Sequence, residues 1–226
     1  MIDSPLTETT QNLFGTKTRG KILLASLASF NTDGFDRVTT AQLAKTADVL
    51  EGTLWYHFKA KTDLVLAHLE TLETRLSDHL GSDLTTSPDK IVSHFLEIFS
   101  IIWDFRYLLR DPLAALQDDD AIAVRLQKTY LVIEKRAEAR IEQAVELGFI
   151  RLNHTTAQTL AVSAFLIGRY WLDYARIRFP KEQNYQSLRL QGIQQLVSLI
   201  RPHFTDKMVH VLEEGNIDLL TEEARS

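Results

Sequence analysis

The segment 55–61, WYHFKAK, places four consecutive ring-bearing side chains next to two lysines, a combination that suits contact with nucleic acid. A flat apolar ring can pack on a thymine methyl group, and tyrosine, histidine and lysine can donate hydrogen bonds to phosphate oxygens. Successive helical residues lie about 100° apart around the axis, so Trp55, Tyr56 and His57 cannot all face the core that Leu54 and Phe58 would face. The alternative is structural, with aromatic rings that seal one part of the protein onto another.

Three short predicted helices would position these rings. A helix over about 17–31 carries a broad apolar stripe and stops near Gly34, which can adopt a left-handed conformation. Thr39 and Gln42 form a capping box, so a second helix of about two turns begins there. A tight connection leads to a third short helix over 51–58. Two short helices joined in this way match the helix-turn-helix unit, whose second helix reads base edges with its N-terminal residues. Gly52 would let the backbone come close to DNA.

The distribution of charge supports the same region. The whole chain has a formal net charge of −5, which by itself argues against a nucleic-acid binder. Residues 17–61, however, hold seven basic and four acidic side chains, a local charge of +3, whereas the rest of the chain is acidic. A polyanion would therefore meet residues 17–61 first.

Composition indicates an all-α protein. The 226 residues include only nine glycines and five prolines, and long stretches are rich in leucine, alanine, glutamate, lysine and arginine. The absence of cysteine excludes disulfides and thiolate sites. We expect no signal peptide and no membrane span, because the first residues carry neither a basic patch nor an apolar run and no stretch approaches about 20 apolar residues. The expected location is cytoplasmic.

The segment VTTAQLAKTADVLEGTLWYHFKAKTDLVLAHLE, residues 38–70, resembles the DNA-binding segment of TetR-family transcriptional regulators. The resemblance implies an all-α homodimer with an N-terminal three-helix head and a C-terminal helical bundle for ligand binding and dimerisation. By position in the family pattern, the residues that would face bases are Glu51, Gly52, Thr53 and Trp55. Those that would contact phosphates are Thr40, Tyr56, His57 and Lys61.

Three positions depart from the family pattern. Asp48 replaces a turn glycine, and Leu50 replaces a serine cap, so the helix start loses an acceptor worth about 1 kcal/mol. Glu51 stands where relatives often have a basic or polar residue. Its carboxylate suits a helix start but repels phosphate, so it would either read a cytosine amine or act against wrong sequences.

The resemblance divides the chain into a flexible N-terminal tail over 1–14, a helix-turn-helix domain over 15–61 and a ligand-binding and dimerisation domain over 62–226. Thr155 and Gln158 form another capping box, which opens a long helix that ends before Pro180. A companion helix is expected over 187–200. Small and apolar residues of these two helices are the expected dimer interface, and the alternative is that they pack inside a monomeric core. The residues are Ala161, Ala164, Gly168, Ala175, Ile193, Leu196, Val197 and Ile200.

An effector pocket is expected among the helices of the C-terminal domain. Its walls would be aromatic with a few polar groups, although core packing is the alternative for each side chain. The expected lining residues are Phe95, Phe99, Trp103, Tyr107, Tyr130, Phe165 and Arg169. A charge such as that of Arg169 among apolar neighbours needs a partner from the protein or from an anionic ligand, or it reaches the surface.

The expected function is a ligand-responsive DNA-binding regulator, a repressor that a small molecule releases from a near-palindromic operator. We expect no enzyme activity, no metal and no cofactor, because hydrolase, nucleotide-binding and zinc-protease motifs are absent. One alternative is an interaction protein that retains the fold but has lost operator binding. A weaker alternative is a helical metal-dependent enzyme, which the single pair of His94 and Glu97 suggests.

Overall fold

The structure is a computed structural model that describes residues 6–80, 97–110, 120–180 and 184–214. Within these ranges the regular structure is helical, and the strand-type pairing consists of one isolated antiparallel bridge between Ile150 and Phe204. The predicted all-α fold is confirmed. Of the residues assigned to sites from sequence, Phe95 lies outside the described ranges, as does His94.

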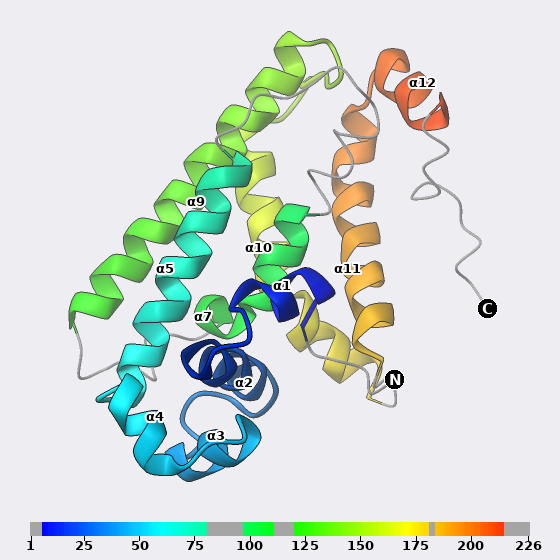
Figure 1. The fold of residues 1–226 in the computed structure, drawn as a ribbon. Helices are drawn as coiled ribbons and strands as arrows, with labels where there is room; N and C mark the ends of the chain where they lie inside the picture. The colour runs from blue at the N-terminus through cyan, green and yellow to red at the C-terminus, as the bar shows by residue number, and fades with distance from the viewer. Residues whose placement is uncertain (1–5, 81–96, 111–119, 181–183, 215–226) are drawn as a thin grey trace. The chain divides into compact units, whose positions relative to one another are not determined.

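The helices follow one another in the order shown in Figure 1. They are α1 (Glu8–Leu13), α2 (Thr18–Asp33), α3 (Thr40–Thr46), α4 (Glu51–His57), α5 (Lys61–Leu80), α7 (Arg106–Arg110), α9 (Asp120–Glu146), α10 (Ala157–Arg178), α11 (Tyr185–Ile200), the 3₁₀ turn η1 (Arg201–His203) and α12 (Asp206–Glu214). Residues 97–104 are helical as well. The chain forms two compact units, one from 1–75 with 100–129 and the other from 76–99 with 130–226.

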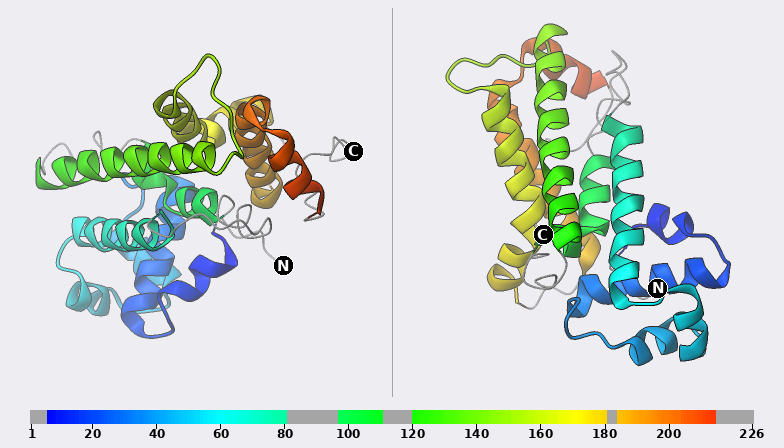
Figure 2. Two further views of the ribbon diagram at one scale, coloured as in Figure 1. Left: turned by 90° about the horizontal axis from the view of Figure 1, so that it is seen from above. Right: turned by 90° about the vertical axis from the view of Figure 1, so that its left-hand side faces the viewer.

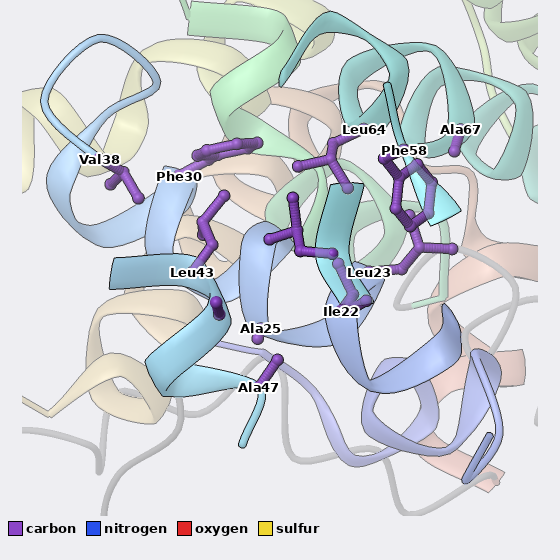
Figure 3. Packing of buried hydrophobic residues seen from close by; sticks show 12 residues of the cluster. Ile22, Leu23, Ala25, Phe30, Val38, Leu43, Ala47, Phe58, Leu64 and Ala67 are labelled. Atoms are coloured by element: carbon purple, nitrogen blue, oxygen red, sulfur yellow. The ribbon is translucent and has the colours of Figure 1, made fainter. Parts of the chain in front are cut away.

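The core of the first unit joins α2, α3, α4 and α5. Figure 3 shows side chains of these helices directed toward one another, among them Ile22, Phe30, Leu43 and Leu64. Each of these four side chains is almost completely buried. Burying a side chain of this size stabilises a fold by roughly 1.5–3 kcal/mol, so the apolar positions of four short helices are sufficient to hold them as one unit. The core therefore fixes the orientation of α4.

The N-terminal helix α1 differs from the expected flexible tail over 1–14. Thr7 caps α1, and both its backbone N–H and its hydroxyl donate to the Asp104 carboxylate. The Thr10 hydroxyl donates to the same carboxylate at 2.6 Å and accepts from Arg75 Nη1 at 2.8 Å. Burial raises the pKa of Asp104, and the hydrogen bonds from Thr10 and Thr7 and the charge of Arg106 oppose that rise. Because Asp104 lies 97 residues from Thr7 and 94 residues from Thr10 along the chain, local sequence could not predict the anchor.

Two buried polar side chains, one on α2 and one on α5, connect these helices to residues 104–107. The Asn31 side chain donates to the Asp104 carbonyl oxygen at 2.6 Å and accepts from the Tyr107 backbone N–H at 3.0 Å. His68 Nε2 lies 3.0 Å from the Leu23 carbonyl oxygen, which can only accept, so this nitrogen carries the proton. Nδ1 then accepts from the Tyr107 hydroxyl at 2.7 Å. Burial lowers the pKa of His68 to about 4, so the ring is neutral at physiological pH.

This arrangement differs from the predicted domain boundary between residues 61 and 62. Residues 100–129 belong with the head in the compact unit, together with most of α5. Sequence periodicity identified the helices but could not show which of them share a core, because that depends on contacts between distant segments. The assignment of DNA binding to 15–61 and of ligand binding and dimerisation to 62–226 remains a prediction.

In the second unit α10 and α11 pack side by side (Figure 2). Gly192 allows this approach: a Cβ at this position would lie 2.6 Å from Trp171 Cδ1 and 2.7 Å from Phe99 Cζ. The Trp171 indole N–H donates to the Leu188 carbonyl oxygen at 2.7 Å, which ties the two helices together. Close packing of a glycine against two aromatic rings leaves no room for a side chain on α11 at this point.

The start of α10 corrects one prediction. Thr156, rather than Thr155, is the cap, and its hydroxyl accepts from the Thr159 N–H at 3.1 Å. The helix therefore begins one residue later than the capping box of Thr155 and Gln158 predicts. A run of two threonines offers two candidate caps with the same chemistry, and only the backbone conformation decides between them.

Candidate nucleic-acid interface

The connection between α3 and α4 forms as predicted. The capping box is present in full, with the Thr39 hydroxyl accepting from the Gln42 N–H and the Gln42 side chain accepting from the Thr39 N–H. Asp48 adopts a left-handed backbone with φ 55°, a conformation that aspartate tolerates better than most residues. The Val49 N–H then closes the turn on the Ala44 carbonyl oxygen at 3.0 Å. The angle between the two helices is therefore set locally.

The side chains of residues 54–58 divide into an inward and an outward set, as the helical spacing predicts. Leu54 and Phe58 are buried in the core of the first unit. Trp55 retains 38% of its surface and Tyr56 retains 75%, so both face outward. His57 is half-buried and stacks edge-on against Tyr56, with 5.2 Å between ring centroids. The structural alternative, in which these rings seal the head onto another part of the chain, does not hold for Trp55 or Tyr56.

Gly52 lies in the first turn of α4 and is exposed. A Cβ at this position would meet no atom of the chain within 4 Å, and the backbone does not have a positive φ. Glycine costs roughly 0.5–1 kcal/mol relative to alanine inside a helix. The fold of the chain gives no reason for this cost, so the reason is to be sought outside the chain, in a molecule that approaches the backbone here.

One predicted phosphate-contacting residue, Thr40, is hydrogen-bonded to one predicted base-facing residue, Glu51. Thr40 is the first residue of α3 and Glu51 the first residue of α4. The Thr40 hydroxyl lies 2.9 Å from Glu51 Oε1 and donates to it. Leu50, the residue before α4, is 80% exposed and makes no side-chain cap, as its type predicts. Thr53 is half-buried in the same turn.

The two lysines behave differently from what the sequence suggests. Lys61 Nζ donates to the Phe35 carbonyl oxygen and lies 4.1 Å from the centroid of the Phe35 ring. Partial burial lowers the pKa of Lys61, and Asp36 acts in the opposite direction. Lys59 lies on the exposed surface, where its Nζ donates to the Trp55 carbonyl oxygen at 3.1 Å. In this structure Lys61 thus holds the α2–α3 loop, and Lys59 is the lysine beside the exposed rings.

The predicted effector-lining residues are distributed over both compact units. Tyr130, Phe165 and Arg169 come together in the second unit: the two rings are 5.7 Å apart, and the Arg169 guanidinium lies 5.1 Å from the Tyr130 ring centroid. Phe99 is in the same unit, where it packs near Gly192. Trp103 and Tyr107 belong to the first unit instead.

Sequence reasoning missed one buried charge near Trp103. The Arg106 side chain is about 1% exposed, its Nη1 donates to the Trp103 carbonyl oxygen at 2.7 Å, and its guanidinium lies 4.7 Å from the Trp103 ring centroid. The Trp103 ring is buried as well.

Within the described ranges, no group of three or more histidine, cysteine, aspartate or glutamate side chains is arranged to hold a metal ion. None of the helices in the same ranges is long and apolar enough to cross a bilayer.

Comparison with known families points to regulators. The family model described as "Bacterial regulatory proteins, tetR family" matches residues 22–68, and the model described as "Bacterial transcriptional repressor" matches residues 67–212. The chain is 23% identical over 180 residues to the nucleoid occlusion factor SlmA of Mannheimia succiniciproducens, an alignment that covers 76% of this chain and 79% of SlmA. Over 65 residues it is 38% identical to the HTH-type transcriptional regulator TtgR of Pseudomonas putida, covering 29% of this chain and 30% of TtgR.

Solved structures show the same fold. A TetR-family transcriptional regulator from Marinobacter aquaeolei superposes with a TM-score of 0.71 at 22% identity, covering 89% of this chain and 98% of that one. The SmeT–triclosan complex superposes with a TM-score of 0.56 at 18% identity, covering 84% of this chain and 92% of SmeT.

Proposed function

Because the chain belongs to the TetR family of ligand-responsive, DNA-binding bacterial regulators, we propose that it is a homodimeric repressor that a small molecule releases from a near-palindromic operator. The family is in general not enzymatic. The observation that carries the DNA-binding part is the outer face of α4. There an exposed tryptophan and tyrosine stand beside Gly52, a glycine that nothing inside the chain requires.

In this proposal α4 enters the major groove and its neighbours hold the DNA backbone. Gly52 and Trp55 face the bases, with room for the backbone of α4 to approach them. The donors available at the C-terminal end of α4 and just after it are the exposed Tyr56 hydroxyl, the His57 ring and the Lys59 ammonium. Lys61 is partly buried against Phe35, whereas Lys59 is exposed beside the Tyr56 ring, so we assign the phosphate contact to Lys59 before Lys61.

We place the dimer interface on a different face of α10 from the one first predicted. Ala161, Gly168 and Ala175 are buried within a single chain, so they have little surface to offer a partner. The large apolar side chains that remain exposed recur at a spacing of three or four residues and therefore share one face of α10. They are Leu166, Tyr170, Tyr174 and Ile177, and Ile177 retains 84% of its surface. On α11, Ile193 and Ile200 are buried as well, while Leu196 and Val197 are half-buried.

The dimer proposal is tested by sedimentation. Ile177→Glu and Tyr170→Glu, made together, should give monomers at micromolar concentration, because two charges would be buried in an apolar interface. The matched control is Leu131→Glu with Val132→Glu, which charges an exposed apolar pair on α9 instead. A dimer that survives the first pair of changes would contradict this interface.

DNA binding is tested with duplexes from the region upstream of the gene. Fluorescence anisotropy should show salt-sensitive binding to one duplex, with an affinity that exceeds binding to random duplex by about a thousandfold or more. If no duplex is preferred at any salt concentration, the alternative of an interaction protein without operator binding replaces this proposal.

The effector part is tested with triclosan, the molecule in the SmeT complex, as the first probe. The proposed contacts are the paired rings of Tyr130 and Phe165, with Arg169 beside them. A ligand that releases DNA must bind more weakly to the operator complex, and the two couplings must be equal in size, typically about 1–3 kcal/mol. Phe165→Ala should reduce the response to the ligand and leave operator affinity without ligand unchanged. Equal ligand affinity with and without operator would rule out the molecule as an effector.

A further inference from the structure

The hydrogen bond between Thr40 and Glu51 connects the first residues of the two helices of the helix-turn-helix. The Thr40 hydroxyl lies 2.9 Å from Glu51 Oε1, on the exposed side of the unit. Glu51 has no basic side chain paired with it among the described ion pairs. The bond from Thr40 engages one of the two carboxylate oxygens of Glu51.

The bond limits the further hydrogen bonds that the Thr40 hydroxyl and the Glu51 carboxylate can make. A threonine hydroxyl has one proton, and here that proton is donated to Glu51, so Thr40 cannot at the same time donate to a phosphate. An ionised carboxylate only accepts. Next to a DNA backbone it would also be repelled by the phosphates, unless a donor on a base compensates for the repulsion. The pair therefore fits a base donor better than a phosphate.

The bases differ in what they offer to an acceptor in the major groove. Guanine presents two acceptors, and thymine presents an acceptor and a methyl group, so both oppose a carboxylate. Adenine has a donor at N6, but the neighbouring N7 is an acceptor and would face the same carboxylate. Cytosine presents the N4 amine as donor, and glutamate is the side chain that pairs with it.

We infer that Glu51 reads a cytosine in each operator half-site and that Thr40 is the residue that positions its carboxylate. This inference rests on the proposed DNA-binding function and adds the identity of one base to it. Thr40 thus acts through Glu51 rather than through a phosphate.

A structural role for the pair is the competing explanation. α4 lacks a side-chain cap, and an acidic residue in the first turn stabilises a helix through its dipole. Glu51 contributes in this way whatever the DNA sequence. A change in base preference at one position, with binding to other positions intact, separates base reading from helix stabilisation.

The experiment selects duplexes from a random pool with the full-length protein and sequences the bound fraction. The wild-type protein should enrich a near-palindrome with cytosine at one fixed position in each half-site. Glu51→Gln should change the preference at that position from cytosine to adenine, because an amide pairs with adenine N6 and N7. The expected discrimination is on the order of tenfold in each case.

Thr40 is tested by a pair of variants. Thr40→Val removes the hydroxyl at nearly constant shape and should weaken the cytosine preference about threefold, while Thr40→Ser should restore it. Thr46→Val is the matched control, because the Thr46 hydroxyl donates to the Gln42 carbonyl oxygen within α3 and does not touch Glu51. Equal preference in Thr40→Val and wild type would remove Thr40 from the positioning role.

The outcomes keep the two proposals apart. A wild-type selection that enriches no sequence contradicts the proposed function itself. A selection that enriches a palindrome whose bases are unchanged by Glu51→Gln leaves DNA binding in place and overturns the reading of cytosine by Glu51.

Discussion

Two glycines on two helices show how differently the same residue can be explained. Gly192 on α11 faces Trp171 and Phe99, and a Cβ there would lie within 2.7 Å of both rings. Gly52 on α4 is exposed, and a Cβ there would touch nothing in the chain. The first glycine is explained by internal packing. The second is not, and the proposed contact of α4 with DNA is what would account for it.

The same contrast applies to the polar side chains around these helices. Asn31 and His68 are buried, and each satisfies its hydrogen bonds inside the first unit. Trp55 and Tyr56 expose large rings to solvent on α4. Groups whose partners are all internal contribute to stability, whereas the exposed groups are the ones proposed to bind. Four predictions follow this distinction.

The largest expected effect is that of Gly192→Ala. The added methyl group would overlap the Trp171 and Phe99 rings, and overpacking of this kind costs about 1–3 kcal/mol. Urea unfolding should show this loss of stability in the second unit. Gly52→Ala is the matched control, because the same substitution at the open site adds no overlap. Equal stability of Gly192→Ala and wild type would mean that α10 and α11 move apart without cost.

The buried histidine predicts a dependence of stability on pH. The pKa of His68 is about 4 in the folded chain and near 6.5 when unfolded, so the unfolded chain binds more protons between these values. The contribution of neutral, buried His68 to the free energy of unfolding is complete above pH 6.5 and decreases as the pH falls toward 4. From pH 7.5 to pH 5 the loss is about 2 kcal/mol. The raised pKa of Asp104 acts in the opposite direction near the lower end of this window.

This dependence is checked by urea unfolding at pH 7.5 and pH 5. The His68→Gln variant should be less stable than wild type at pH 7.5 and should change less between the two pH values. If the two proteins show the same pH dependence, other groups are responsible for it.

The substitution Gly52→Ala should separate binding from stability. Alanine suits a helix better, so the free energy of unfolding should rise by roughly 0.5–1 kcal/mol. Operator affinity should fall by about tenfold, equivalent to about 1.4 kcal/mol, because the methyl group prevents close approach of the backbone to DNA. Anisotropy and urea titrations on the same preparation measure both quantities. Affinity and stability that rise together would show that α4 does not approach a ligand at Gly52.

The smallest effect is expected for Leu50→Ser. Leu50 is largely exposed and gives α4 no cap, so serine would supply the missing acceptor and stabilise the first unit by about 1 kcal/mol. Leu50→Ala is the control, since alanine loses the same apolar surface without adding an acceptor. The midpoint of thermal unfolding should be higher for Leu50→Ser than for Leu50→Ala. Equal midpoints would show that water already accepts from the backbone N–H groups in the first turn of α4.

The sequence by itself determined the features that depend on neighbours along the chain. The capping box of Thr39 and Gln42, the left-handed Asp48 and the division of the ring cluster into inward and outward side chains all follow from spacings of one to four residues. Such patterns specify local backbone and the orientation of one helix face. They are sufficient to identify the helix-turn-helix and its family.

The tertiary structure decided what depends on distant partners. Only packing shows that Lys61 turns to the Phe35 carbonyl oxygen, that Asp104 anchors α1 and that Thr40 gives its proton to Glu51. It also buries Ala161 and Ala175 and leaves Ile177 exposed, although all three lie on one helix. Burial and hydrogen-bond partners are properties of the assembled core, and residues far apart in sequence share them only once the chain has folded.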